Sequence, residues 1–322
     1  MGTTTEPIPV LLPPQQRLLD QVQKALAEID HGGSSRGILM SGPSGTGKTT
    51  AMDLVAKLPL PRGTGPQRCV PCCRIEAKAR SDTSSVAQSI LEELGKPAAV
   101  TRRLRGWELE RQVHQALIAC GVRILILEEF NNALLANTKH LRGQLAQFLK
   151  NLWNLHPVGD PSSWALPQPS RGDRRLVIIV SGTEEIRPVF DRDAELSSRF
   201  DIRINTTRLW FDSAKSCEQF ARVFGSLVER FGLSEAIDAS NASTLARSMF
   251  ATQAHLRELE SLLRRAATLH RAAGAELTGE ALLAEALDDR RGPHEGRANP
   301  FRWSYEELKE RVAAARNAPR HG

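Results

Sequence analysis

The sequence predicts an α/β protein, in which a parallel sheet is flanked by helices and followed by a small C-terminal helical lid domain. From residue 37 to about residue 205, short apolar runs alternate with amphipathic helical patterns. The two richest runs, 124–127 and 176–180, are apolar at every position, as expected of strands covered on both faces. Beyond about residue 209, only helical patterns remain. Strands that alternate with helices in this way are typical of a parallel sheet with crossover helices.

These patterns divide the chain into four segments. Residues 1–34 are a Pro-rich lead and one helix, 35–207 the α/β domain, 208–289 the helical domain and 290–322 a basic tail. The tail carries eight Arg or Lys against four Glu, a net charge of +4, and we expect a docking segment rather than core. The strands are expected at 37–41, 72–77, 123–129, 176–182 and 201–205.

The composition indicates a soluble protein of the cytoplasm. The chain has 322 residues and a net charge of +6, which permits a nucleic-acid partner. It contains no apolar run long enough for a membrane span and no basic-then-apolar signal pattern, so we expect no membrane contact. The five cysteines suit a reducing compartment. Cys69, Cys72 and Cys73 include a C-x-x-C but lack a second pair, so buried small residues are expected rather than a zinc site.

A phosphate-binding loop is the clearest motif. The stretch GPSGTGKTT matches G-x-x-x-x-G-K-[ST], with a predicted strand before it and a predicted helix after it. Its glycines let backbone N–H groups turn toward phosphate oxygens, its lysine reaches the β- and γ-phosphates, and the following threonine hydroxyl ligates magnesium. We therefore expect ATP and Mg²⁺ to bind here. The loop residues are Gly42, Pro43, Ser44, Gly45, Thr46, Gly47, Lys48, Thr49 and Thr50.

A pair of acids follows the first of the two fully apolar runs. The run Ile124–Leu127 ends in Glu128 and Glu129, where a phosphate-loop fold places one acid near magnesium and another near the attacking water. The first acid of such pairs is usually Asp. Glu is one methylene longer and could still reach the water shell of the metal, so the exchange brings turnover into question more than ATP binding. The rival interpretation is an exposed acidic strand end.

Further polar residues extend the predicted site. Ser181 and Thr183 end the run LVIIVSGT, where a hydroxyl can bond the γ-phosphate or the lytic water. Arg199, in DRDAELSSRFD, could reach the nucleotide of a neighbouring subunit as an arginine finger, with Arg192 as the weaker candidate. Arg257, near the start of a helix in the helical domain, could fold back onto the phosphates. The alternative for each arginine is a solvated helix face.

Together these motifs resemble an AAA+ ATPase. Within that superfamily the chain resembles the TniB/TnsC group of regulators of bacterial DNA transposition, over about residues 10–270. At the acid pair, relatives of this group are expected to have DEF or DEA followed by His or Asn, whereas this chain has EEFNN. The stretches that carry the resemblance are GILMSGPSGTGKTT, IEAKARSDTSSVAQSILEELGKP, ILILEEFNNAL and LVIIVSGTEEIRPVFDRDAELSSRF.

The resemblance implies a role for each site residue. Lys48 and Thr49 would bind triphosphate and magnesium, Glu128 would share the metal, and Glu129 would be the catalytic base. Ser181 or Thr183 would be the first sensor, Arg199 the finger and Arg257 the second sensor. Proteins of this group form ATP-dependent rings or spirals of identical subunits on double-stranded DNA. They recruit a transposase and a target-selecting partner of the TniQ type, and hydrolysis disassembles them.

Basic residues on three loops suggest where DNA would bind. Arg and Lys on loops around one pore would neutralise phosphates without reading the base sequence. The alternative is that such clusters only solvate a surface. No base-reading motif is visible, so the expected binding is independent of DNA sequence. The candidate residues are Lys78, Arg80, Arg102, Arg103, Arg105, Lys139 and Arg142.

Two other functions remain open. The chain could be an AAA+ or STAND-like ATPase of another DNA pathway, such as plasmid maintenance, helicase loading or phage defence. It could instead be a nucleotide-gated scaffold with little hydrolysis, in which Glu128 has slowed turnover and ATP acts as a structural clamp. Turnover distinguishes the scaffold from the ATPases, and ATP-dependent assembly on DNA distinguishes the transposition regulator from most others.

Overall fold

The computed structural model describes residues 11–58, 70–96, 106–135, 138–154, 175–273, 277–291 and 298–317. The described residues form two compact units. An α/β unit comprises Pro13–Pro43 and Lys48–Thr206. A helical unit takes in Thr207 onward, together with Leu12 and the loop residues Ser44–Gly47. The predicted fold class, a parallel sheet flanked by helices and followed by C-terminal helices, is confirmed.

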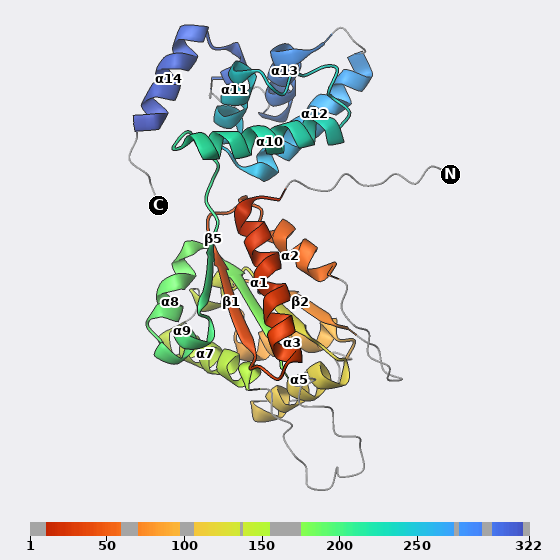
Figure 1. Ribbon diagram of the computed structural model, residues 1–322, viewed down its shortest axis with the longest axis vertical. Helices are drawn as coiled ribbons and strands as arrows, with labels where there is room; N and C mark the ends of the chain where they lie inside the picture. Colours follow the sequence, from red (N-terminus) through yellow and green to blue (C-terminus); the bar gives the residue numbers. More distant parts are fainter. Residues whose placement is uncertain are drawn as a thin grey trace, which may run out of the picture. The chain divides into compact units, whose positions relative to one another are not determined.

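The sheet of the α/β unit has five strands in the order β2-β3-β4-β1-β5, and every neighbouring pair is parallel (Figure 1). Because all five strands run the same way, their carboxyl ends meet at one edge, where an open α/β sheet binds ligands. The strands are β1 (Arg36–Ser41), β2 (Cys72–Glu76), β3 (Ile124–Glu128), β4 (Val177–Gly182) and β5 (Ile202–Asn205).

Helices cover both faces of this sheet, which explains why its inner strands are apolar throughout. On one face, Ile38 and Met40 of β1 pack with residues of the helices α1 and α2. On the other face, Leu39 of the same strand packs with α3, α5 and α7. All five residues of β3 are buried, and all six of β4. A charged side chain on these strands therefore reaches water only at their ends.

The helices of the α/β unit begin at residues suited to capping. Asp82 caps α3 by accepting from the Ser85 N–H at 2.8 Å, and Asp193 caps α9 by accepting from the N–H groups of Glu195 and Leu196. The elements are α1 (Pro13–Asp30), α2 (Lys48–Ala56), α3 (Thr83–Glu93), α5 (Trp107–Ala119), α6 (Asn131–Leu134), α7 (Lys139–Trp153), η3 (Glu184–Ile186), α8 (Arg187–Asp191) and α9 (Ala194–Arg199).

The helical unit has its own hydrophobic core, built around Phe220, Phe224 and the apolar face of α12. The segment expected from sequence to be a docking tail contributes Phe301 to this core, and its Leu308 is buried as well. The sequence pattern missed this because charged and polar residues are frequent around the two apolar positions. The elements are α10 (Ala214–Arg230), α11 (Ala242–Thr252), α12 (Leu256–Ala273), α13 (Gly279–Arg291), η5 (Pro300–Arg302) and α14 (Tyr305–Asn317).

Two features bear on the composition-based expectations. Cys73 and Cys120 are buried in the hydrophobic core, and burial raises the pKa of Cys72 to about 11, so its thiol is a poor nucleophile at neutral pH. Cys69 lies outside the described residues.

Among the helices of the described residues, none has the length and apolar character that a membrane crossing requires.

Candidate active site

The phosphate loop leaves the carboxyl end of β1 and is fixed by the strands on both sides. Gly42 N–H donates to Gly182 O at 3.2 Å, and Thr206 N–H donates to Ser41 O at 2.8 Å. Gly42 has φ +156°, and a β-carbon there would lie only 3.0 Å from the carbonyl carbon of Thr206 and closer still to two of its oxygens. Only glycine fits this approach of two backbones, so the first glycine of the motif is required structurally.

Lys48 and Thr49 occupy the first turn of α2, as the motif predicts. The buried Lys48 ammonium donates to the carbonyl oxygens of Gly42 (2.8 Å) and Pro43 (2.9 Å), so it lies over the loop. Thr49 and Thr50 are exposed at the amino end of the helix. Free backbone N–H groups and the helix dipole make such an end suitable for an anion. A phosphate group could therefore meet the Lys48 cation and exposed hydroxyls together.

The tip of the loop, Ser44–Gly47, groups with the helical unit. Within that unit, Leu256 N–H at the start of α12 donates to Gly45 O at 3.1 Å. The neighbouring His255 is partly buried, and this burial, with the charge of Arg208, lowers the pKa of His255. Arg257 follows on the same helix and is exposed. Within the helical unit, the helix start that carries Arg257 is thus bonded to Gly45.

Glu128, the first acid, is buried at the end of β3 and does not stand alone. Its Oε1 accepts from Nε of Arg74 on β2, and Nη1 of the same guanidinium donates to Oδ1 of Asp53 on α2. Burial raises the pKa of Glu128, and Asp53 and Glu76 add to this effect, while the contact with Arg74 opposes it. Arg74 therefore links the strand of the acid pair to the helix that begins with Lys48.

Glu129, the second acid, has left-handed backbone, with φ +48°. A non-glycine residue in this region is strained by about 1 kcal/mol or more, and such strain is concentrated at functional sites. The turn is held by Asn132 N–H, which donates to Glu129 O at 2.9 Å, and by Phe130 N–H, which donates to Ser181 O at 2.9 Å. Glu129 is partly exposed, whereas Glu128 is buried.

The polar end of β4 lies next to the acid pair because β3 and β4 are neighbours. Ser181 is buried, and Thr183 is partly exposed. The Asn131 side chain accepts from Thr183 N–H at 3.2 Å through Oδ1, which joins the end of β4 to the turn after Glu129. The structure therefore brings Ser181, Thr183 and both acids to the same sheet edge as the phosphate loop. Asn131 was not singled out from the sequence.

A divalent cation would find suitable ligands at this edge. Asp53 lies four residues after Thr49 on α2, so the two side chains are on the same helix face. The Thr49 hydroxyl and the carboxylates of Asp53 and Glu128 are oxygen donors, which Mg²⁺ prefers. The residues present thus fit the group that the motif implies.

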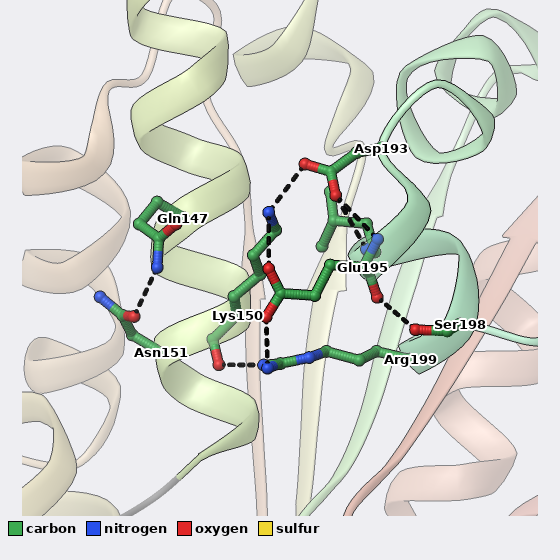
Figure 2. A network of polar contacts seen from close by, with 8 residues as sticks. Gln147, Lys150, Asn151, Asp193, Glu195, Ser198 and Arg199 are labelled. Carbon is green, nitrogen blue, oxygen red and sulfur yellow. Dashed lines mark hydrogen bonds and ion pairs between the residues drawn. The ribbon is translucent and has the colours of Figure 1, made fainter.

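Arg199, the expected finger, is engaged within its own subunit. Its guanidinium donates to Lys150 O at 2.6 Å and to Glu195 Oε1 at 2.5 Å, and it lies 5.9 Å from the ring centre of Trp153. Figure 2 shows Arg199 pointing from α9 across to α7, with Lys150 between the carboxylates of Asp193 and Glu195. We call Lys150, Asp193, Glu195 and Arg199 the α7–α9 brace.

The charges of the brace reinforce one another. The hydrogen bond to Asp193 raises the pKa of Lys150, with Glu195 adding to it. Burial would raise the pKa of Asp193, but the bonds from Lys150 and from the Leu196 N–H hold it below its ordinary value. Arg192, the weaker finger candidate, is exposed one residue before the brace.

Several solved structures have a fold similar to that of this chain. ORC2 of Aeropyrum pernix, solved as ADPNP–ADP complexes, matches with a TM-score of 0.62 at 13% identity, over 99% of this chain and 85% of that one. Its ADP form matches with a TM-score of 0.57 at 14% identity, over 98% and 82%. Cdc6p of Pyrobaculum aerophilum matches with a TM-score of 0.56 at 14% identity, over 88% and 69%. At such identities the likeness shows the fold, which is that of AAA+ proteins.

The family model described as "TniB: Bacterial TniB protein" matches residues 10–159, somewhat less than half of the chain. Over these residues the chain is similar to TniB proteins. The matched residues include the phosphate loop, Arg74 and the acid pair, so the resemblance inferred from the sequence is confirmed. None of the curated proteins matches the sequence.

The basic residues proposed to bind DNA lie partly within the described residues. Lys78 and Arg80 are exposed just after β2, and Arg80 has left-handed backbone with φ +61°. Arg80 N–H donates to Asn132 O at 3.2 Å, which fixes this loop to the turn after β3. Lys139 is exposed and Arg142 half-buried in the first turn of α7. Arg102, Arg103 and Arg105 lie outside the described residues.

Arg74 and Asp53 are the main site residues that the sequence did not reveal. A weak signal exists for Arg74, since it is the one charged residue between Cys72 and Ile75 in a strand with buried neighbours. Asp53 gives a similar signal through its four-residue spacing from Thr49. Neither signal shows that the two side chains meet, because their contact depends on where β2 lies relative to α2.

Proposed function

We propose that this TniB-type protein is an ATP-dependent regulator of DNA transposition. It binds ATP with Mg²⁺, assembles on double-stranded DNA as a ring or filament of identical subunits, and recruits a transposase and a TniQ-type target-selection protein. The observation that carries the proposal is the meeting of the phosphate loop and the acid pair at one edge of a parallel sheet, within the part of the chain that matches TniB.

Nucleotide binding rests on the loop geometry. The Lys48 ammonium lies over the carbonyls of Gly42 and Pro43, where it can move to phosphate oxygens with a small change in side-chain torsion. The amino end of α2 presents its exposed hydroxyls beside it. The AAA+ neighbour ORC2 was solved with ADPNP and ADP, which is consistent with the same ligand class here.

Hydrolysis would use Glu129 as the base. Its carboxylate would accept a proton from the attacking water, while Thr183 or Ser181 orients that water or the γ-phosphate. Lys48 and the loop N–H groups would stabilise the negative charge that develops on the phosphate oxygens. When bound, Mg²⁺ would supply further positive charge there, with Thr49 and Glu128 as its protein ligands.

A neighbouring subunit would complete the site with an arginine. For Arg199 to act in this way it must leave Glu195 and the Lys150 carbonyl, so subunit contact and brace opening would be coupled. Arg192 would not first have to leave the brace, because it lies outside the brace and is already exposed. Arg257 would act from the helical unit as the second sensor.

Contact with DNA would come from the loops after β2 and β3. Lys78, Arg80, Lys139 and Arg142 would bind phosphates without base contacts. Each cation removed should lower the slope of log affinity against log salt by about 1. Arg102, Arg103 and Arg105 belong to the same proposal.

One alternative has an observation in its favour. Because Glu128 is held by Arg74, turnover could be slow enough for ATP to act as a structural clamp. This nucleotide-gated scaffold would assemble with ATP but hydrolyse little. An AAA+ or STAND-like ATPase of another DNA pathway would hydrolyse without assembling on DNA in the presence of ATP.

The test measures ATP hydrolysis and particle size with and without duplex DNA, for the wild type and for Lys48→Ala, Glu129→Gln and Glu128→Asp. The regulator predicts large DNA-bound particles with ATP, their loss in Lys48→Ala, and persistent particles without turnover in Glu129→Gln. Faster turnover in Glu128→Asp would show that the longer acid slows hydrolysis. An absence of assembly on DNA in every nucleotide state would contradict the transposition proposal.

A further inference from the structure

We propose that Arg74 is a built-in competitor for the divalent cation at Glu128, and that it sets the Mg²⁺ concentration at which this protein holds its nucleotide. The inference rests on the proposed function, since it concerns the same site. It assigns Arg74 as a positioning residue that acts through Glu128.

The first argument is the contact itself. Glu128 is the buried acid at the end of β3, and its Oε1 is already bonded to Nε of Arg74. The Glu128 side chain is 9% exposed, so few other groups can reach it. A carboxylate oxygen that accepts from a guanidinium has lost part of its capacity to bind a cation. A metal that binds Glu128 must therefore share this carboxylate with the Arg74 guanidinium, through either oxygen, or displace the guanidinium.

The second argument is charge. Arginine stays protonated at any pH a protein survives, so Arg74 places a permanent positive charge beside the site. Asp53, the other partner of Arg74, and Glu76, which is aligned with Glu128 in the sheet, supply two more negative charges. Two carboxylates bonded to one guanidinium, with Glu76 aligned beside Glu128, leave an excess of negative charge. The cluster is thus suited to bind a second cation beside Arg74. The positive charge of Arg74 lowers the affinity of the cluster for that cation.

The third argument is position on the fold. Asp53 shares a helix face with Thr49, and Arg74 joins this helix to Glu128. The guanidinium therefore bridges the two elements that would supply metal ligands. The Arg74 side chain is 28% exposed, so it can swing toward water when a cation takes its place.

The test measures divalent-cation dependence of nucleotide binding by the full chain. The probe is N-methylanthraniloyl-ATP, whose fluorescence is followed during titration with MgCl₂, and Mn²⁺ bound in the presence of ATP is followed by electron paramagnetic resonance. The variants are Arg74→Gln, which removes the charge, Arg74→Lys, which keeps it, and Asp53→Asn. Arg36→Gln is the matched control, because Arg36 is paired with Glu28 at the amino end of β1, the opposite edge of the sheet.

Removal of the charge in Arg74→Gln should lower the Mg²⁺ midpoint by about five- to tenfold. Arg74→Lys and Arg36→Gln should stay within about twofold of the wild type. Asp53→Asn should raise the Mg²⁺ midpoint, because it removes one carboxylate from the cluster and leaves Glu128 as the only carboxylate partner of Arg74 among the contacts described above. This last variant keeps the proposal testable if Arg74→Gln does not fold.

An unchanged or higher midpoint in folded Arg74→Gln would overturn the inference, as would an unchanged midpoint in Asp53→Asn. A lower melting temperature without a shift in midpoint would show a structural ion pair only, and would also overturn it. In these cases the proposed ATP site stands, because the wild type still binds nucleotide. If the wild type shows no Mg²⁺-dependent nucleotide binding, the proposed function fails and the inference with it.

Discussion

Gly37 offers a sharp test of how β1 and α9 pack. A β-carbon on Gly37 would lie 2.6 Å from Arg199 O and 2.7 Å from two ring atoms of Phe200, where ordinary contact begins near 3.4 Å. Relief would require a movement of roughly 0.7 Å by a backbone carbonyl and a fully buried ring. Gly37→Ala should therefore cost about 1–3 kcal/mol, the usual range for an overpacked core. For a unit of this size that corresponds to a melting temperature lower by about 2–12 °C.

Gly143, in the middle of α7, provides the matched control. Nothing lies within 4 Å of a β-carbon built there. Gly143→Ala should stabilise the protein by about 0.5–1 kcal/mol, because alanine loses less backbone entropy than glycine in a helix. Differential scanning calorimetry of both variants checks the pair. If Gly37→Ala melts with the wild type, the contact between β1 and the Arg199–Phe200 backbone is looser than the structure shows and the reasoning fails.

Three further predictions concern the brace and the C-terminal segment. Lys150→Met should lower the free energy of unfolding in urea by about 1–2 kcal/mol, because it leaves Asp193 and Glu195 without their shared partner at a partly exposed site. The pKa of Asp193 is lowered in the folded protein, so the stability it contributes is present above its unfolded pKa of about 3.9 and is lost as pH falls through the lower, folded pKa. The free energy of unfolding of the wild type should therefore fall between neutral pH and a pH below 4. In Asp193→Asn this fall should be smaller, because the carboxylate that causes part of it is missing. Phe301→Ala should cost about 3 kcal/mol if the segment belongs to the helical core, whereas Tyr305→Ala, at a side chain that is 69% exposed, should change the melting temperature little.

Much of the fold could be predicted from the sequence because its inner strands carry a strong signal. The runs at 124–127 and 176–180 are apolar on both faces, and the structure places β3 and β4 there with every residue buried. The phosphate loop was equally visible, since its glycines are required by close backbone approach rather than by packing. In these cases a local pattern has a local physical cause.

The contacts that define the site were less visible because they join distant residues. Arg199 bonds to the carbonyl of Lys150, 49 residues away, and so the brace could not be read from either segment alone. Arg74 meets Glu128 across 54 residues and Asp53 across 21, through a strand order that the sequence does not specify. The roles of Arg199, Arg257 and the basic loops stay predictions.

The strand order also constrains the folding of the nascent chain. β1 pairs with β4 and β5, so Arg36 lies opposite Val177, and Gly42 bonds to Gly182. Because the chain is synthesised from its amino end, more than a hundred residues are made after β1 before its neighbours β4 and β5 are available for pairing. Closing so long a loop is slow, and the apolar strand stays available to other chains meanwhile. The phosphate loop is thus among the last parts of the sheet to be completed. If ATP binds there as proposed, it would stabilise only a nearly complete α/β unit, not an early folding intermediate.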